Sequence, residues 1–144
     1  MSTERNKAIV RRFFEEAWNN NDLAVADETY SVDNVHHFGG SRGTLGPDKM
    51  REMITAWRTS IPGYRFHIED MVAEGDVVVA RLQFNGTHTA AGLQIGARTA
   101  TPQNKSFAEA EMVMARLKDG KIVESWATWD RLSFLEQLGA IAKP

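Results

Sequence analysis

The sequence predicts one α+β domain spanning residues 1–144, with helices gathered on one face of an antiparallel sheet. Up to Ile61, apolar residues recur at helical spacing; from Tyr64 onward they alternate with polar residues, which is the period of a strand. Near the end, a strand pattern at 121–129 runs directly into a short helical pattern at 131–138. A chain of 144 residues is long enough for one well-packed core and too short for two ordinary domains.

Three helices are expected in the first part of the chain. Residues 4–19 carry a broad apolar stripe with charges on the opposite side. A run of asparagines then ends that helix, and a short second helix is expected from Leu23 to Tyr30. Residues 31–46 are rich in glycine and are expected to form turns. The third helix is expected at 47–61, because proline suits a first helical turn and Pro62-Gly63 ends the pattern.

Four strands follow the helices. They are expected at residues 64–70, 77–84, 107–117 and 121–129. Glu74-Gly75-Asp76 and Asp119-Gly120 have the composition of hairpin turns. Residues 87–105, rich in Gly, Ala and Thr, are expected to be a broken strand and a loop. The last residues, 131–138, form the expected C-terminal helix.

Composition excludes several classes of function. A net charge of -2 and an isoelectric point near 6.1 give no reason to expect nucleic acid or an anionic membrane as a partner. The absence of cysteine excludes disulfides and thiolate catalysis. No secretory leader or membrane-spanning run is recognisable, so a cytoplasmic location is expected. The histidines lack metal-ligand spacing and no phosphate-binding loop occurs, so neither a metal nor another cofactor is expected.

The end of the chain resembles a known family. Gly120-Lys-Ile-Val-Glu-Ser-Trp126, followed by Trp129-Asp130 and Gln137-Leu138-Gly139, resembles the SnoaL-like polyketide cyclases, which belong to the nuclear-transport-factor-2-like superfamily. Supporting likenesses are the aromatic first helix, the Gly46-Pro-Asp-Lys-Met50 start of the third helix, and Asn85-Gly-Thr-His-Thr89. The resemblance implies a cone-shaped barrel, a strongly curved sheet wrapped around a cavity that the helices close.

The resemblance also implies a reactive set that this sequence changes. In the cyclases, an aspartate near the end of the last strand is the acid–base group of an aldol closure; it matches Ala127 here, although a shift of a few positions would give Asp130 that role. A glutamine and a histidine of the family match Glu111 and Val113, and an asparagine matches His36.

Two acids on the third strand are the main candidates for catalysis. Alternation places Phe107, Glu109, Glu111 and Val113 on one face, and both faces of the strand are apolar enough to be covered. A buried carboxylate needs a partner or a wet cavity, so either acid would have a raised pKa and could transfer protons. The alternative is that they pair with Arg81 or a lysine, or face solvent.

Other polar residues are candidates around the same cavity. Asp130 either caps the last helix or lies at the pocket rim. Only one of His36 and His37 can face a shared cavity, because adjacent residues on extended chain point to opposite sides. A neutral imidazole there would assist Glu111, and His88 is the alternative partner.

Aromatic residues are expected to form the core and the wall of the cavity. Trp18 and Phe38 belong to this set. Trp126 and Trp129 fall on opposite strand faces, and Trp129 is the one expected to line the cavity. An aromatic-walled cavity with few polar groups is the usual form of a small-molecule site.

These observations favour a cofactor-free enzyme acting on a hydrophobic oxygenated small molecule, through cyclisation, isomerisation or dehydration. Glu111, His36 and Asp130 are its expected catalytic residues, and His88, Trp129, Glu109, Phe38, Trp18 and Arg81 its expected ligand-binding residues. The alternatives are a non-catalytic binding domain of the same fold, and hydration of the epoxide-hydrolase type, which would need Arg81 between two acids inside the cavity. A homodimer is expected through the apolar face of the third strand.

Overall fold

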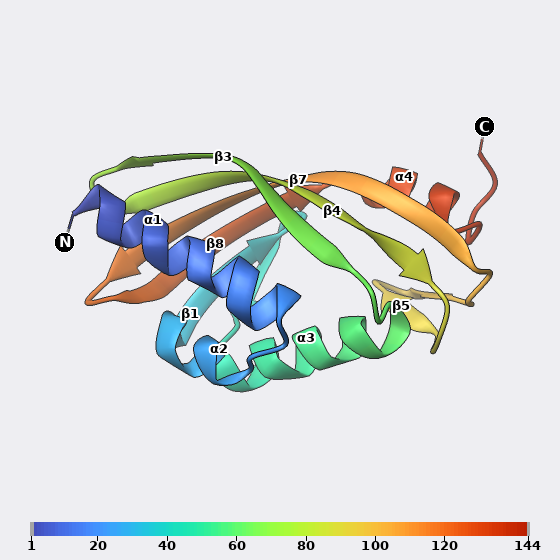
Figure 1. Cartoon of the computed structure of the whole chain (residues 1–144), viewed down its shortest axis with the longest axis horizontal. Coiled ribbons are helices and arrows are strands. Elements are labelled where there is room, and N and C mark those ends of the chain that lie inside the picture. Colours follow the sequence, from blue (N-terminus) through green and yellow to red (C-terminus); the bar gives the residue numbers. More distant parts are fainter. Residues whose placement is uncertain (1, 144) are drawn as a thin grey trace.

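The computed structural model describes residues 2–143 (Figure 1). The helices are α1 (Thr3–Arg12), the π-helical η1 (Phe13–Asn19), α2 (Ala24–Thr29), α3 (Pro47–Ser60) and α4 (Arg131–Gln137). The strands are β1 (Tyr30–Phe38), β2 (Ser41–Thr44), β3 (Arg65–Glu74), β4 (Val77–His88), β5 (Leu93–Ile95), β6 (Arg98–Ala100), β7 (Lys105–Lys118) and β8 (Lys121–Trp129). None of the described helices is long and apolar enough to cross a membrane.

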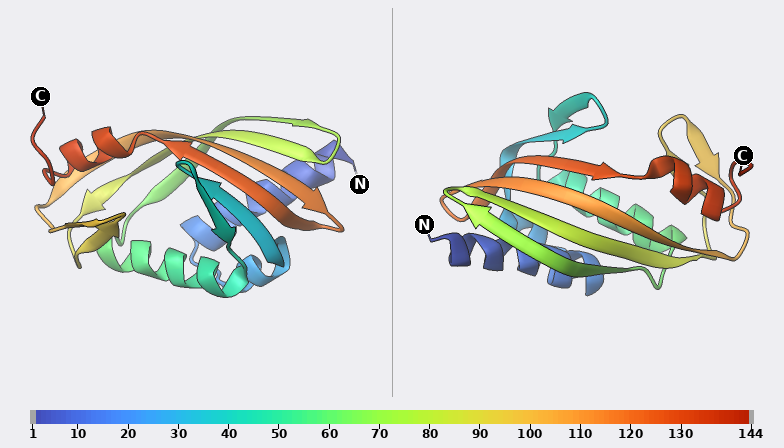
Figure 2. Two further views of the ribbon diagram at one scale, coloured as in Figure 1. Left: turned by 180° about the vertical axis from the view of Figure 1, so that it is seen from behind. Right: turned by 90° about the horizontal axis from the view of Figure 1, so that it is seen from above.

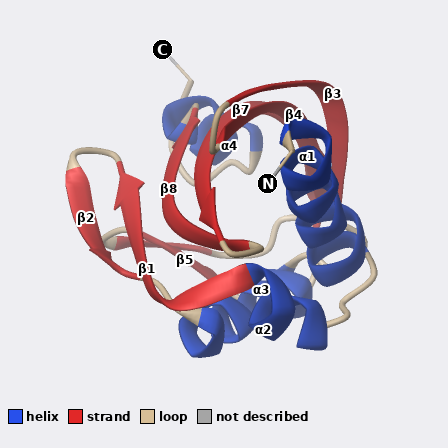
Figure 3. Cartoon of the chain, turned by 90° about the vertical axis from the view of Figure 1, so that its left-hand side faces the viewer, coloured by secondary structure: helices blue, strands red, loops and turns tan. Residues whose placement is uncertain are grey.

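The main sheet is curved around the helices. Its strand order is β2-β1-β8-β7-β4-β3, and every neighbouring pair is antiparallel except β1 and β8, which are parallel. Strands β5 and β6 form a separate hairpin. Seen along its length, the sheet curls over α1 and α3, which close the concave side (Figure 3). This is the predicted α+β cone.

The first helix changes from α-helical to π-helical winding where it packs on the sheet. Its final turns, η1, are wound as a π-helix, and this winding buries Phe13, Phe14, Ala17 and Trp18 together. The side-chain amide of Asn19 then fixes the helix end to β3: its Nδ2 donates to the Phe66 carbonyl at 2.8 Å, and its Oδ1 accepts from the Phe66 amide at 2.7 Å. These two hydrogen bonds fix the position of the helix end relative to the edge strand β3.

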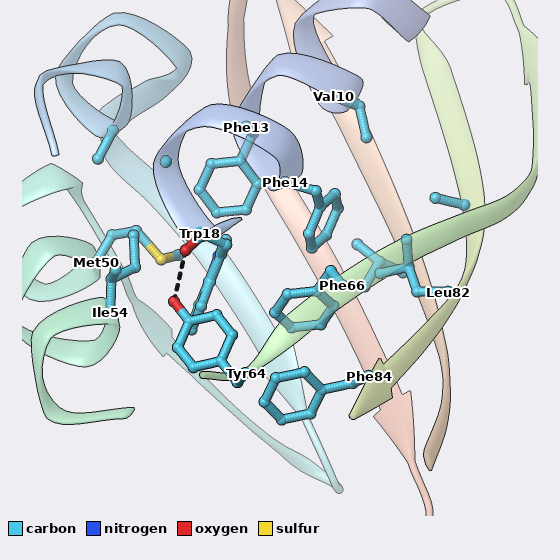
Figure 4. Packing of buried hydrophobic residues seen from close by; sticks show 14 of the residues in the cluster. Val10, Phe13, Phe14, Trp18, Met50, Ile54, Tyr64, Phe66, Leu82 and Phe84 are labelled. Atoms are coloured by element: carbon cyan, nitrogen blue, oxygen red, sulfur yellow. Dashed lines mark hydrogen bonds between the residues drawn. The ribbon is translucent and has the colours of Figure 1, made fainter. Parts of the chain in front are cut away.

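Aromatic packing fills the space between η1 and the sheet (Figure 4). Phe66 and Phe84 stack at 4.4 Å between ring centroids, and Trp18 meets Phe66 edge to face at 5.3 Å. The Tyr64 hydroxyl donates to the Trp18 carbonyl at 2.8 Å, which satisfies the one polar atom of a buried ring. This layer is the floor of the space that the sheet encloses.

The helices and the four expected strands are confirmed, as are the two hairpin turns. Gly75, Asp119 and Gly120 all have positive φ, as such tight turns require. Two expectations are corrected. Residues 31–46, expected to be turns, form the β1–β2 hairpin, and the segment 87–105 contains the end of β4 and the β5–β6 hairpin.

The chain leaves the outer face of β7 uncovered. Ala108 and Ala110 are exposed there, and Met112 is 50% exposed, so the expectation that both faces are covered does not hold within one chain. Covering of this face by a second copy stays a prediction.

Candidate functional site

A cavity of about 590 Å³ lies between the concave face of the sheet and the helices. Its wall is mostly aromatic and aliphatic, and it opens between the β1–β2 and β5–β6 hairpins, which project from the same side of the molecule (Figure 2). Its lining includes Phe13, Phe14, Trp18, Tyr30, His36, Phe38, Arg42, Met50, Met53, Trp57, Phe66, Phe84, Gln94, Glu111, Val113, Ala127, Trp129 and Arg131. The size and the apolar wall fit a small organic molecule.

Strands β7 and β8 supply one wall through alternate residues. Glu111 lies opposite Trp129, and Val113 lies opposite Ala127, in the antiparallel register. All four side chains line the cavity. The intervening residues, such as Met112 and Trp126, face the other side of the sheet, because successive side chains of a strand alternate between faces.

Glu111 is the only acid that lines this cavity within residues 2–143. No hydrogen bond or ion pair to its carboxyl group occurs in that range. Burial raises its pKa from the ordinary 4.5 to about 7, because the apolar wall disfavours the charged form. The group can therefore both accept and donate a proton near neutral pH.

A chain of polar side chains fixes the orientation of His36. Asn34 Nδ2 donates to the Leu45 carbonyl at 3.1 Å and to Ser125 Oγ at 3.3 Å. Ser125 Oγ lies 2.7 Å from His36 Nδ1. Burial lowers the pKa of His36, and the neighbouring His37 lowers it further, so the imidazole is held neutral.

The Tyr30 side chain also lines the cavity. Burial raises the pKa of its phenol well above the ordinary value; Ser125 acts in the opposite direction, and the charge of Glu111 raises the pKa further. The phenol therefore stays protonated and is a further hydrogen-bonding group close to both Ser125 and Glu111.

The middle of the cavity has an aromatic wall. Trp129 packs edge to face against Trp57 at 6.0 Å and against Phe134 at 5.0 Å, measured between ring centroids. Phe38 lies 6.4 Å from Trp129 and 6.1 Å from the His36 ring. These rings pack against one another and form one continuous aromatic surface of the cavity.

Two arginines lie at the mouth of the cavity. Arg42 is exposed in the β1–β2 hairpin, and Arg131 is the first residue of α4. The guanidinium carbon of Arg131 lies 4.9 Å from the centre of the Phe38 ring. The mouth is therefore more positive than the interior.

The structure brings five of the expected site residues to the cavity: Glu111, His36, Trp129, Phe38 and Trp18. His37 faces the other side of the sheet, where it stacks on Trp126 at 4.9 Å and bonds to Glu124 at 2.8 Å.

Two expected acids lie elsewhere. Asp130 caps α4 by accepting from the Ser133 amide at 2.9 Å, which was one of its two expected roles. Glu109 is buried beneath α4, where its carboxylate accepts from the Gln137 side chain. Burial raises the pKa of Glu109, but no part of this residue lines the cavity.

Arg81 and His88 also need correction as ligand-binding residues. Arg81 lies on the outer face of β4, where it pairs with Asp70, and both side chains are exposed. His88 is fully buried, and its Nε2 bonds to the Ala91 carbonyl at 2.8 Å. Neither side chain reaches the cavity lining.

Sequence reasoning missed Tyr30, Asn34, Ser125 and the two mouth arginines. Ser125 shares strand parity with Ala127 and Trp129, which could have identified it as inward-facing. Asn34 and Arg42 lie in the segment 31–46 that was expected to be turns. Tyr30 was expected to end the second helix, and Arg131 is the first residue of the expected C-terminal helix. Residues 2–143 contain no group of three or more His, Asp or Glu side chains placed so that they could hold a metal ion.

Solved structures with this fold carry different names. The proposed hydroxylase AclR of Streptomyces galilaeus is 22% identical, with a TM-score of 0.82 over 99% of this chain and 86% of that one. A proposed polyketide cyclase of Bacillus cereus is 26% identical, with a TM-score of 0.78 over 99% and 87%. An LEH-like epoxide hydrolase of M. tuberculosis is 19% identical, with a TM-score of 0.70 over 96% and 92%.

One family profile, that of the SnoaL-like polyketide cyclases, matches residues 8–138. No protein with a curated description matches the sequence. The match covers nearly the whole chain, and the chain therefore belongs to the SnoaL-like polyketide cyclase family.

Proposed function

We propose that this protein is a cofactor-free acid–base enzyme that moves a proton next to a carbonyl group of a hydrophobic, oxygenated small molecule. The observation that carries the proposal is Glu111, a carboxyl group without a partner in residues 2–143, set in an apolar cavity, with a pKa of about 7. Such a group is close to the optimum for proton transfer at neutral pH.

In the first step, the Glu111 carboxylate removes a proton from the carbon next to the carbonyl. The C–H electron pair moves into a new carbon–carbon double bond, and the carbonyl oxygen becomes an enolate. Return of the proton to another carbon completes an isomerisation. If the enolate carbon instead attacks a second carbonyl of the same molecule, a carbon–carbon bond forms, the second oxygen takes the proton, and a ring is closed.

His36 would stabilise the enolate oxygen. The Leu45 carbonyl can only accept, which fixes the amino group of Asn34 as the donor toward Ser125. Ser125 accepts that bond and has its own proton left for His36 Nδ1. The imidazole then carries its proton on Nε2 and donates from there as a neutral group, as an oxyanion donor requires.

One observation favours a second candidate, a non-catalytic binding domain. Ala127, which matches the aspartate of the family's cyclases, lines the cavity as a methyl group. The same cavity would then hold a ligand by apolar contact alone. Epoxide hydration of the expected kind is not favoured, because Arg81 lies on the outer face of the sheet.

Hydrogen–deuterium exchange of 2-tetralone, a two-ring ketone with acidic C–H bonds, tests the proposal. We expect the protein to accelerate exchange in D2O, followed by NMR, and Glu111→Gln to remove roughly 100-fold or more of that acceleration. Glu109→Gln is the matched control, because Glu109 is an acid on the same strand that lies outside the cavity. This variant should accelerate ketone exchange as much as the wild type does. If wild type binds the ketone but leaves its exchange at the buffer rate, the binding-domain candidate replaces the enzyme.

A further inference from the structure

The mouth of the cavity carries two guanidinium groups that no described acid neutralises. Within residues 2–143, Arg42 and Arg131 line the cavity and form no ion pair. The arginines that are paired with Asp or Glu lie elsewhere: Arg11, Arg12, Arg51, Arg81 and Arg116. The nearest acid in sequence, Asp130, is occupied in capping α4 through the Ser133 amide.

The guanidinium of Arg131 lies close to both hairpins. It lies over the Phe38 ring at 4.9 Å, and a methyl group added at Gly96 would lie 3.2 Å from its Nη1. It therefore interacts with Phe38 in β1, and Gly96 is a near neighbour between β5 and β6. Stacking uses the flat face of a guanidinium and leaves the N–H groups at its edge available to an acceptor.

The other polar groups of the mouth do not offer a comparable site. The side chain of Gln94 is hydrogen-bonded within its own hairpin: its Nε2 donates to the Gly96 carbonyl at 3.0 Å, and its Oε1 accepts from the Thr99 hydroxyl at 3.1 Å. Ser41 and Thr44 are exposed hydroxyls. Inside the mouth the lining is aromatic and aliphatic apart from Tyr30, His36 and Glu111. The cavity thus has a cationic mouth, an aromatic middle and one acid in its depth.

We propose that Arg131, assisted by Arg42, binds an anionic group of the substrate, and that the substrate class is a hydrophobic, ring-containing keto acid. A guanidinium edge can bind a carboxylate through two parallel hydrogen bonds. Arg42 is more exposed and contributes long-range attraction of the anion. The proposal rests on the proposed function for the position of the ring system, with its acidic C–H beside Glu111.

The register of β7 and β8 makes this arrangement possible. Glu111 lies directly opposite Trp129, and Arg131 follows two residues later, within about 7 Å of Trp129 along the chain. A molecule of one or two rings on Trp129 would then extend toward the acid at one end and toward the guanidinium at the other.

Binding of 2-naphthoate, compared with the neutral 2-naphthamide of the same shape, tests the subsite. Titrations near pH 6, followed by tryptophan fluorescence, keep the probe carboxylate ionised while Glu111 is mostly protonated. Wild type should bind the acid about tenfold more tightly than the amide. Arg131→Gln should remove this preference and leave amide binding within about twofold; Arg42→Gln should reduce it about threefold, more at low salt. Arg65→Gln, at an exposed arginine outside the cavity, should change neither affinity.

Three results would overturn the subsite. Equal binding of acid and amide by wild type would show that the mouth does not select charge. Equal weakening of both probes by Arg131→Gln would show that Arg131 only supports the wall. Absence of binding by either probe would exclude a two-ring carboxylate. The 2-tetralone exchange assay uses a neutral ketone and Glu111→Gln, so it can succeed when the charge preference fails and fail when the preference is present.

Discussion

Replacement of Glu111 by glutamine should change how the stability of the protein depends on pH. Burial raises the pKa of Glu111 from 4.5 to about 7, so between these values the folded chain holds a proton that the unfolded chain releases. The contribution of Glu111 to the free energy of unfolding is therefore largest below about pH 4.5, and it decreases as the pH rises to about 7. At about 1.36 kcal/mol for each unit of pKa, the loss amounts to about 3 kcal/mol. Glutamine cannot ionise, so the variant lacks this loss.

Urea unfolding at a series of pH values, followed by tryptophan fluorescence, measures the difference in free energy of unfolding between wild type and Glu111→Gln. The other titrating groups are common to both proteins, and any packing change adds an offset that does not vary with pH. We expect the difference to move by about 3 kcal/mol in favour of the variant across this window, and to be constant above it. If the difference in free energy of unfolding stays the same from about pH 4.5 to about pH 7, the carboxyl group of Glu111 is not buried without a partner.

Three further predictions concern the packing of β4, the cap of α4 and the side chain of Ser125. Gly86→Ala should destabilise the fold by about 1–3 kcal/mol in urea unfolding, because the new methyl group would lie 2.7 Å from a side-chain atom at the end of α3. Asp130→Ala should lower the free energy of unfolding by about 1 kcal/mol, because the cap on α4 is lost, and should leave naphthamide binding unchanged. Weaker naphthamide binding would show that Asp130 contributes to the pocket rim. Ser125→Ala should destabilise by about 1–3 kcal/mol, since it leaves buried hydrogen-bonding groups unpartnered, and should slow ketone exchange; an unchanged exchange rate would contradict the proposed donor chain.

Alternation along single strands made part of the site predictable. In β7 it placed Glu111 on the same face as Val113, which also lines the cavity, and in β8 it separated Trp129 from Trp126. In β4 the same rule was harder to apply, because Val77, Val78 and Val79 are apolar on both faces and do not show where Arg81 points. Only the register opposite Met112 places that arginine on the outer face.

Non-local pairing explains the rest of what was missed. Strand β1 is rich in polar residues and ends beside glycines, so its local composition resembles a turn. It forms a strand because β8, far away in the sequence, pairs with it in parallel and β2 pairs with its other edge. That pairing brings His36 to Ser125 and places Arg42 at the mouth. Single-strand patterns contain no information about such a partner.

The proposed chemistry depends above all on the pKa of Glu111. Carboxyl carbon NMR on labelled protein, with Glu111→Gln to assign the signal, gives its pKa without a substrate. We expect a value of about 7, because the carboxyl group is alone in an apolar cavity. A value of about 4, the ordinary range of a solvated or ion-paired glutamate, would refute proton transfer by Glu111 and leave the cavity as a binding site without a catalytic acid.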